Sequence, residues 1–281
     1  MILITGAGGT VGSEVVKELQ SIGAPFRAAF HSEDKAAAAR ARGIDAVVID
    51  YTRPETLTAA LDGVDRLFLL SGGAPDQTQR ELNMVEAAKN AGVRHVVKLS
   101  VIDADTESYS FAKVHRPVEK AIEASGMAWT HLRPNGFMQN LSNYMIGTIR
   151  DQGAFYSSLG EAKVSHVDVR DVAAVAAKAL TEPGHEGKAY TLTGPEGLTY
   201  AEIASKISAA SGREVRYVNV SDDDVKGALT GTGTPADYAD AYVDLLRFYR
   251  SGAASRGTDD VRRVTGRDAR QFDEYARDYF A

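Results

Sequence analysis

The sequence contains no cysteine. This absence excludes disulfide bonds, thiolate catalysis and metal sites that use cysteine ligands. Long apolar runs are missing as well, because no segment approaches the length that a membrane-spanning helix needs. The first strand-like segment begins at Met1, which leaves no room for a signal peptide. We therefore expect a cytoplasmic protein that does not interact with membranes.

Positive charge is in deficit, since 32 Lys and Arg residues stand against 38 Asp and Glu residues, for a formal net charge of -6. Without a run of Lys or Arg, we expect no direct contact with nucleic acid. The six histidines are scattered and form no H-x-x-x-H pair, so we predict no metal site. Neither the G-x-S-x-G turn of α/β-hydrolases nor the G-K-[ST] ending of an NTP-binding loop occurs.

A glycine turn directly after the first apolar segment is the most informative feature that is present. Strand-like residues 2–5 run into this turn, and a helix-like segment at 11–22 follows it. Gly6 permits the sharp turn, Gly9 lets the backbone approach a diphosphate, and Gly12 lets the helix pack closely on the sheet. The N–H groups at the helix start bind the anion. The sequence therefore predicts a dinucleotide site with contacts from Gly6, Gly8, Gly9, Thr10, Val11 and Gly12.

The first half of the chain alternates between strand-like and helix-like segments. We expect strands at residues 2–5, 26–30, 46–49, 66–70, 96–100 and 129–132. We expect helices at residues 11–22, 34–42, 54–61, 76–91 and 112–125. Apolar runs without alternation, such as 67–70, indicate strands that helices cover on both faces. The pattern predicts an α/β fold, a Rossmann-type doubly wound parallel sheet whose ligands bind at the carboxyl ends of the strands.

After about Pro134 this alternation changes. We expect helices at residues 137–149, 172–180, 200–211, 235–250 and 268–279, and short strands at 154–157, 189–193 and 215–220. These segments predict a smaller C-terminal α/β lobe over the carboxyl edge of the sheet. Residues 1–136 would form the NAD(P)-binding core, and residues 137–281 mainly a substrate-binding lobe, with segments that return to the core. We interpret Asp171 as the N-cap of the helix at 172–180.

Several motifs resemble those of the NmrA-like atypical short-chain dehydrogenase/reductases. They are Thr5-Gly-x-x-Gly-x-x-Gly12, the turns at 61–65 and 91–95, and Leu132-Arg-Pro-Asn-Gly-Phe-Met-Gln-Asn140. Segment order and length match over nearly the whole chain. The resemblance is greatest to the quinone oxidoreductase and triphenylmethane reductase type, which reduces small aromatic electrophiles with NADPH. Other relatives are dinucleotide sensors that regulate transcription without catalysis.

The end of the second strand determines which cofactor binds. An NAD site usually places an acidic residue there for the ribose 2′-OH, whereas an NADP site needs positive charge. The sequence offers His31 and Lys35, and His31 stands where the family usually has arginine. We therefore expect NADP(H) as the preferred cofactor, with NAD(H) as the alternative. His31 as a solvated loop residue, with Glu33 and Asp34 beginning the next helix, is the other interpretation.

Further cofactor contacts follow from position in the fold. Asp50 and Tyr51 end the third strand, where the family commonly holds the adenine, although a helix-capping turn explains them equally well. Ser71 and Gly72 end the fourth strand, where small residues let the backbone approach the nicotinamide ribose. Pro134, at the end of the sixth strand, completes the expected set.

Two alignments compete for the catalytic residues. Tyr109 and Lys113 form a Y-x-x-x-K pair, in which a tyrosine donates a proton and a lysine lowers its pKa. The family pattern instead places the tyrosine and lysine columns at Phe111 and His115. A shift of two residues turns a helix face by about 200°, so the two pairs cannot serve one site.

We favour His115 as the catalytic or ribose-binding residue, because Glu119, Gly126 and the Leu132-Arg-Pro134 segment align with it without a gap. Tyr109 and Lys113 would then be surface residues just before the helix. Hydride transfer to a conjugated acceptor does not require a tyrosine, since delocalisation spreads the arriving charge and water can supply the proton.

The expected substrate pocket lies above the nicotinamide. Its walls would come from Asn135, Phe137, Met138, Asn140 and Tyr144. The predicted function is reduction of a quinone, dye or related carbonyl compound by NAD(P)H, with a small molecule as the substrate. The alternative is an NAD(P)-binding redox sensor or regulatory protein without turnover. We expect a monomer or a homodimer.

Overall fold

Seven parallel strands form the central sheet of the protein. The computed structural model describes residues 1–73 and 75–281. The strands are β1 (Ile2–Ile4), β2 (Phe26–Phe30), β3 (Ala46–Val48), β4 (Arg66–Leu69), β5 (His95–Leu99), β6 (Ala128–Pro134) and β8 (Lys188–Leu192). Their order is β3-β2-β1-β4-β5-β6-β8, and each neighbouring pair is parallel. This order confirms the predicted doubly wound sheet, with its switch point between β1 and β4.

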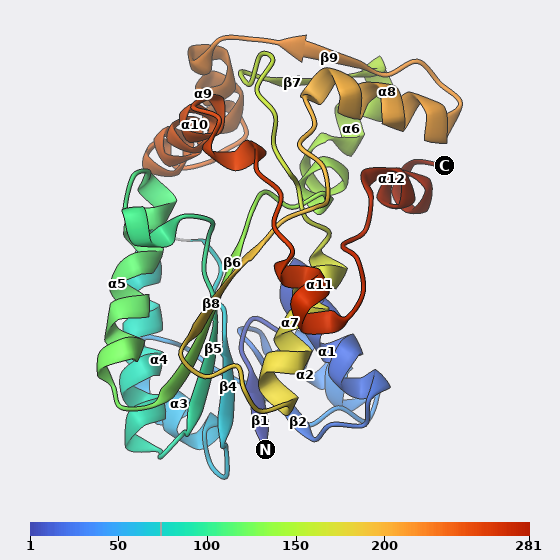
Figure 1. Ribbon diagram of the computed structural model, residues 1–281. Helices are drawn as coiled ribbons and strands as arrows, with labels where there is room; N and C mark the ends of the chain where they lie inside the picture. The colour runs from blue at the N-terminus through green and yellow to red at the C-terminus, as the bar shows by residue number, and fades with distance from the viewer. Residues whose placement is uncertain (74) are drawn as a thin grey trace.

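Helices cover both faces of the sheet, as Figure 1 shows. One face packs against α1 (Thr10–Ser21), α2 (Glu33–Arg40), α7 (Val169–Thr181) and α11 (Asp260–Thr265). The other face packs against α3 (Pro54–Ala60), α4 (Gln77–Asn90) and α5 (Ser110–Ala124). Within β4, Leu67 and Leu69 point into the second core and Phe68 into the first, and all three are fully buried. The strands lack alternation because both faces are covered.

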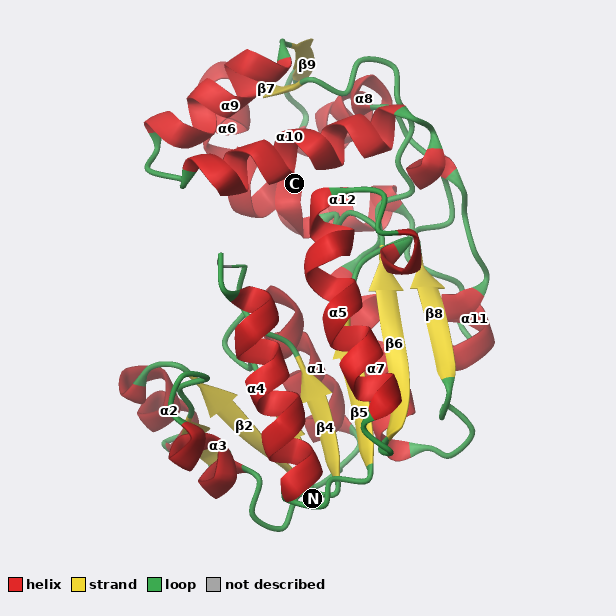
Figure 2. Cartoon of the chain, turned by 90° about the vertical axis from the view of Figure 1, so that its left-hand side faces the viewer, coloured by secondary structure: helices red, strands yellow, loops and turns green. Residues whose placement is uncertain are grey.

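A third hydrophobic core holds the C-terminal lobe together. There β7 (Ala154–Ser157) pairs in parallel with β9 (Arg216–Asn219). The lobe helices are α6 (Ile146–Gln152), α8 (Tyr200–Ser211), α9 (Asp222–Gly231), α10 (Ala236–Arg250) and α12 (Phe272–Phe280). Phe155, Ile203 and Leu246 lie in this core. Figure 2 shows the lobe over the arrowheads of β4, β6 and β8, so the lobe covers the edge where ligands of such sheets bind.

The second half of the chain also departs from the predicted elements. The strand predicted at 189–193 is β8, which pairs with β6 in the central sheet. The helix predicted at 268–279 is α12, which begins only at Phe272. No prediction covered α11, which ends at Thr265 and is followed by Gly266 with a φ of 73°. Residues 141–145 form a π-helical turn before α6. No prediction covered α9, which begins with a capping box between Ser221 and Asp224.

The interpretation of Asp171 as an N-cap is wrong. Asp168 is the N-cap of α7, and its carboxylate accepts the Arg170 N–H at 2.8 Å. Asp171 lies in the first helical turn and accepts hydrogen bonds from the backbone and guanidinium of Arg270. In the described part of the chain, no helix is both long enough and apolar enough to span a bilayer.

Candidate functional site

The glycine turn after β1 has the shape that a dinucleotide requires. Gly6 has a φ of 62°, and a Cβ there would meet the Leu70 side chain at 2.9 Å. At Gly12, a Cβ would lie 2.1 Å from the Gly6 carbonyl oxygen, so close packing of α1 on the turn depends on this glycine. A Cβ at exposed Gly9 would meet only the Gly6 oxygen, at 3.3 Å. Apart from this oxygen no atom lies close to that position, which leaves room for the approach of a diphosphate.

The beginning of α1 also favours an anion. Its N-cap is Gly9, and neither a capping side chain nor an acidic residue occupies the first turn. The N–H groups of this turn thus keep their partial positive charge for a ligand. The residues present therefore fit a pyrophosphate at the predicted position.

The end of β2 carries the residues expected to choose the cofactor. His31 and Lys35 are both exposed. The Lys35 side chain extends over the glycine turn, because its Cδ lies 3.5 Å from the place of a Cβ on Gly8. Ser32 caps α2, and Glu33 and Asp34 lie in its first turn. The prediction that Glu33 and Asp34 begin the next helix is thus confirmed. Contact of His31 and Lys35 with a 2′-phosphate stays a prediction.

The residues expected at the ends of β3 and β4 have partners within the chain. Asp50 accepts the Thr52 N–H at 2.9 Å and the Thr52 hydroxyl at 2.7 Å, and these bonds lower the pKa of Asp50. Tyr51 donates its hydroxyl to the Leu70 carbonyl at 2.9 Å. Asp50 therefore organises the turn before α3, which agrees with the interpretation of residues 50 and 51 as a helix-capping turn. Contact with adenine stays a prediction.

Tyr109 does not lie on the surface, so that expectation is wrong. Its side chain is 1% exposed, its hydroxyl donates to the Ile102 carbonyl at 2.6 Å, and its ring stacks on Phe248 at 4.3 Å. Burial raises the pKa of the Tyr109 phenol far above its usual value. Lys113, by contrast, is exposed on α5. Tyr109 is thus a buried structural residue whose proton is held by a backbone oxygen.

His115 belongs to a buried polar cluster that the sequence did not reveal. We call Ser71, Gln77, Glu81, Lys98 and His115 the Lys98 cluster; it joins the end of β4 with α4, β5 and α5. Lys98 and Glu81 form an ion pair at 2.7 Å with side chains 0% and 1% exposed. Glu81 also accepts the Ser71 hydroxyl at 2.8 Å. The only sequence signal was a lysine inside the apolar strand at 95–99.

Two aromatic residues, one from the core and one from the lobe, meet near the loop after β4. Phe111 of α5 and Tyr238 of α10 meet edge to face with ring centroids 5.6 Å apart. The Tyr238 ring also covers the loop after β4, because a Cβ on Gly73 would lie 3.1 Å from it. Tyr144 is 80% exposed. Burial, and to a lesser degree the Tyr144 phenol, raise the pKa of Tyr238. Sequence analysis missed Tyr238 because α10 is distant from α5 along the chain.

The predicted substrate residues divide between surface and core. Asn140 and Tyr144 are exposed, and Phe137 is half-buried against the core on the α1 and α7 face. Met138 is 2% exposed and packs inside the lobe core, and its contact with substrate stays a prediction.

Asn135 is buried as well, and its amide donates to Ala254 at 2.8 Å and accepts the Gly136 N–H at 2.9 Å. These bonds hold the loop after β6 in place and leave the amide engaged, which argues against the expected contact of Asn135 with substrate. The buried Pro134 accepts the Ile102 N–H through its carbonyl at 2.9 Å.

Comparison with known proteins assigns the chain to a family, since residues 1–276 match the model of the NmrA-like family. The chain belongs to that family. It is 44% identical to an NAD(P)H azoreductase from Xenophilus azovorans, over 100% of this chain and 98% of that protein. An NADPH-dependent quinone oxidoreductase from Escherichia coli, solved with NADPH, has a TM-score of 0.90 at 31% identity over 100% of both chains. Triphenylmethane reductase from Citrobacter sp., solved with NADP(H), has a TM-score of 0.87 at 29% identity over 99% of both chains.

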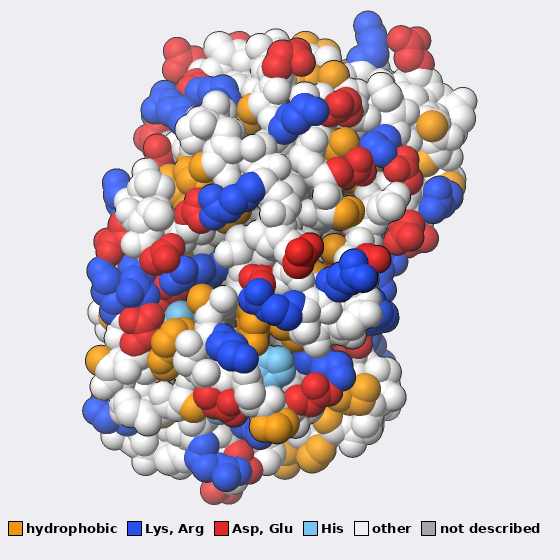
Figure 3. Space-filling view, viewed as in Figure 1, with side chains coloured by type: hydrophobic (Ala, Val, Ile, Leu, Met, Phe, Trp, Pro, Cys, Tyr) orange, Lys and Arg blue, Asp and Glu red, His pale blue; other side chains and the backbone are white. Residues whose placement is uncertain are grey.

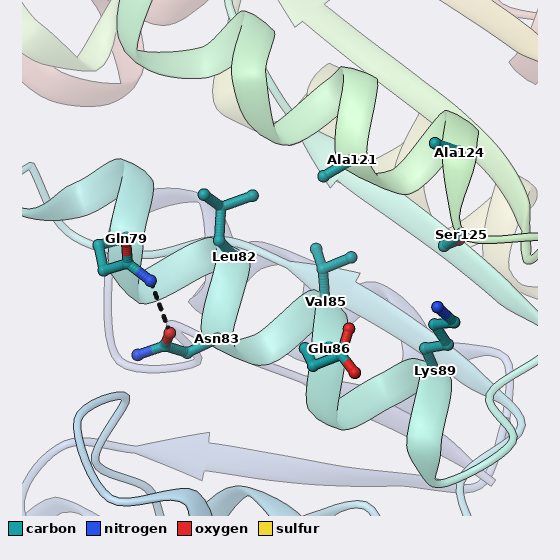
Figure 4. A pocket seen from close by; sticks show the side chains of 9 residues that line it. All are labelled: Gln79, Leu82, Asn83, Val85, Glu86, Lys89, Ala121, Ala124 and Ser125. Carbon is teal, nitrogen blue, oxygen red and sulfur yellow. Dashed lines mark hydrogen bonds between the residues drawn. The ribbon is translucent and has the colours of Figure 1, made fainter.

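A groove of about 490 Å³ between α4 and α5 is separate from this site. Figure 4 shows Leu82 and Val85 of α4 pointing toward Ala121 and Ala124 of α5. No residue predicted for cofactor or substrate lines the groove. On the face seen in Figure 3, Lys and Arg side chains are interspersed with Asp and Glu.

A second polar cluster on α5 brings possible metal ligands together. Ligand atoms of Glu119, Glu123 and His131 lie within 4.8 Å of one another. Both carboxylates are already paired with arginine: Glu119 with Arg133 at 2.8 Å, and Glu123 with Arg116 at 2.6 Å. The guanidinium groups supply the positive charge that a cation would bring, so we assign no metal to this cluster.

Proposed function

We propose that the protein is an NADP(H)-dependent reductase of small conjugated acceptors such as quinones and dyes. The observation that carries this proposal is the open face of Gly9 at the uncapped start of α1, in a chain of the NmrA-like family. The turn fits a diphosphate. Reductases that use NADPH or NAD(P)H are similar to this chain in sequence, and one of them in fold, over the full length of the chain. The relatives' activities favour an enzyme over a sensor.

In this proposal the sheet binds the cofactor and the lobe completes the substrate pocket. The N–H groups at Gly9 and the start of α1 hold the pyrophosphate. Lys35 and His31 bind the 2′-phosphate, and charge on His31 increases when the phosphate raises its pKa. The loop that begins at Ser71, together with His115, receives the nicotinamide ribose. Residues 1–136 thus serve mainly the cofactor, and residues 137–281 mainly the substrate.

The aromatic residues near the loop after β4 suit a flat acceptor. Bound NADPH supplies the hydride from its nicotinamide ring. Phe111 and Tyr238 present an aromatic wall, against which a conjugated ring packs through offset or edge-to-face contacts. Since Phe111 carries no hydroxyl and the Tyr109 hydroxyl is engaged, water provides the proton that accompanies reduction. The chain therefore contributes orientation of the two reactants and exclusion of bulk solvent.

The proposal is tested by following oxidation of NADPH and NADH by the purified protein with quinones, azo dyes and triarylmethane dyes. We expect turnover with at least one class and a preference for NADPH that weakens with rising salt, because contact with the 2′-phosphate is electrostatic. Tight NADPH binding without turnover of any acceptor would favour the sensor.

The matched control is Gly9→Val, which should keep the fold and lose NADPH binding in calorimetry. Gly12→Val should disturb the fold itself, because its Cβ would collide with the Gly6 backbone.

A further inference from the structure

A fully buried lysine in the central strand β5 calls for an explanation. Lys98 lies in an otherwise apolar strand, beside Val97 and Leu99. Three acceptors surround its ammonium group: Glu81 Oε2 at 2.7 Å, the Leu99 carbonyl oxygen at 2.5 Å and His115 Nδ1 at 3.0 Å. Apolar side chains of similar size would stabilise a core as well as a buried ion pair does. Stability alone therefore does not account for this pair.

The position of Lys98 determines where the proton of His115 lies. An ammonium group has three N–H donors and no acceptor, so His115 Nδ1 accepts and carries no proton. Burial and the positive charge of Lys98 both hold the pKa of His115 well below its usual value, and the ring is therefore neutral. The single ring proton must then be on Nε2.

The Nε2–H group of His115 has no acceptor among the residues that the structure describes. Gln77 Nε2 lies 3.4 Å away, but this amide nitrogen is itself a donor, toward Glu81 Oε1 at 3.4 Å. The same Glu81 oxygen accepts the hydroxyl of Ser71, the first residue after β4. A buried donor without an acceptor costs free energy unless a ligand supplies the acceptor. Through Gln77 and Glu81, His115 Nε2 is connected to Ser71, the first residue of the loop expected to receive the nicotinamide ribose.

We propose that Lys98 and Glu81 are positioning residues that hold His115 as an Nε2–H donor to a ribose hydroxyl of bound NADP(H). This inference rests on the proposed cofactor, although not on turnover. Lys98 fixes the ring orientation and tautomer, and Glu81 holds the ammonium group in place. Of the charged groups near the ring, Lys98 comes from β5 and Glu81 from α4. The next acid on α5, Glu119, is bound to Arg133.

The test begins with the wild-type protein without cofactor, labelled with ¹⁵N in histidine. Long-range ¹H–¹⁵N spectra distinguish a protonated ring nitrogen from an unprotonated one, and His115→Gln assigns the resonances. We expect His115 to show protonated Nε2 and unprotonated Nδ1 from about pH 5.5 to about pH 8, where ordinary histidines titrate. Addition of NADPH should shift the Nε2 resonance most. A proton on Nδ1, or an unchanged Nε2 resonance at NADPH saturation, would overturn the proposal.

The second measurement removes the positioning pair without leaving a lone buried charge. In the double variant Glu81→Gln, Lys98→Met, we expect both tautomers of His115 to be populated and NADPH affinity to fall about tenfold, the value of one hydrogen bond. The matched control is Arg116→Met, Glu123→Gln, which removes an ion pair from α5, the helix that carries His115, and should leave NADPH affinity unchanged. Wild-type tautomer and affinity in the double variant would contradict the inference. Failure of the proposed reductase activity would show separately, as NADPH binding without turnover.

Discussion

Two buried polar clusters on α5 differ in one respect. His115 belongs to the Lys98 cluster, and Glu119 lies one helical turn farther on. The Glu119 carboxylate accepts from Arg133 at 3.0 and 2.8 Å and pairs with Arg116 at 2.9 Å. The Glu119 cluster, which we define as Glu119, Glu123, Arg116, Arg133 and His131, thus gives its buried carboxylate both arginine partners. The Lys98 cluster instead leaves one donor, His115 Nε2–H, without an acceptor.

This difference indicates that two neighbouring residues of α5 have different roles: Glu119 stabilises the fold, and His115 is available to a ligand. Burial raises the pKa of Glu119, but the hydrogen bonds and charge of Arg133 outweigh burial and hold it at about 2. A network of this kind stabilises the contact between α5 and β6. Among the described residues its unpartnered buried atom is His131 Nδ1, an acceptor when Nε2–H donates to Glu123, and not a donor. A donor that lacks an acceptor, in contrast, contributes fully only when a ligand binds. The comparison predicts that changes in one cluster affect stability and changes in the other affect binding.

The largest effect on stability should follow from removing the central carboxylate of the Glu119 cluster. Glu119→Ala removes a carboxylate that is 0% exposed and leaves Arg133, only 12% exposed, without its main partner. We expect the free energy of unfolding to fall by about 3–5 kcal/mol, as when one member of a buried pair is lost. Urea denaturation followed by circular dichroism measures this. The folded fraction should bind NADPH with wild-type affinity, and a large loss of affinity would show that the two clusters are not independent.

Acid should reveal two windows in the pH dependence of stability, one from buried histidines and one from Glu119 of the Glu119 cluster. Burial lowers the pKa of His131 and of His166 to about 4, below the usual value of 6.5. The unfolded chain therefore binds more protons, and stability present above about pH 6.5 is lost as the pH falls toward 4. The Glu119 contribution is present above its usual pKa of 4.5 and is lost as the pH falls toward about 2.

We expect losses of a few kcal/mol in the histidine window. Urea midpoints from pH 8 to pH 3 measure them, and His131→Gln should flatten the upper window while leaving the lower one. Equal flattening of both windows would mean that these groups titrate as one system.

Cofactor affinity should report on His115. His115→Gln keeps a polar side chain of similar length but loses the fixed N–H, and we expect the NADPH dissociation constant to rise about tenfold. Unfolding free energy should change much less than in Glu119→Ala. Glu119→Gln is the matched control on the same helix, because it replaces a neighbouring polar residue without touching the Lys98 cluster. If the control weakens NADPH binding as strongly as His115→Gln, the assignment of binding to one cluster fails.

How far the sequence predicted this arrangement depends on the range of the interactions. Gly6 is required by its own φ of 62°, and Gly12 by contact with the Gly6 backbone, so local spacing was enough to place the glycine cradle and, with it, the sheet. Lys98 was visible as a charge in an apolar strand, but its partners come from α4 and α5, and only the packing of three elements brings them together. The burial of Met138 could not be predicted for the same reason, because the lobe core that buries it is assembled from distant segments.

The smallest effect concerns Tyr109, a third buried group at the start of α5. Its hydroxyl already donates to the Ile102 carbonyl, so it resembles the Glu119 cluster rather than His115. Tyr109→Phe should lower the free energy of unfolding by about 1 kcal/mol, since the ring stays stacked on Phe248 while one buried hydrogen bond is lost. NADPH oxidation should continue at the wild-type rate. If Tyr109 were instead the proton donor of a Y-x-x-x-K pair, turnover would fall by about a hundredfold or more. That loss, together with full activity of His115→Gln, would place the chemistry at Tyr109 and reverse the roles of the two residues.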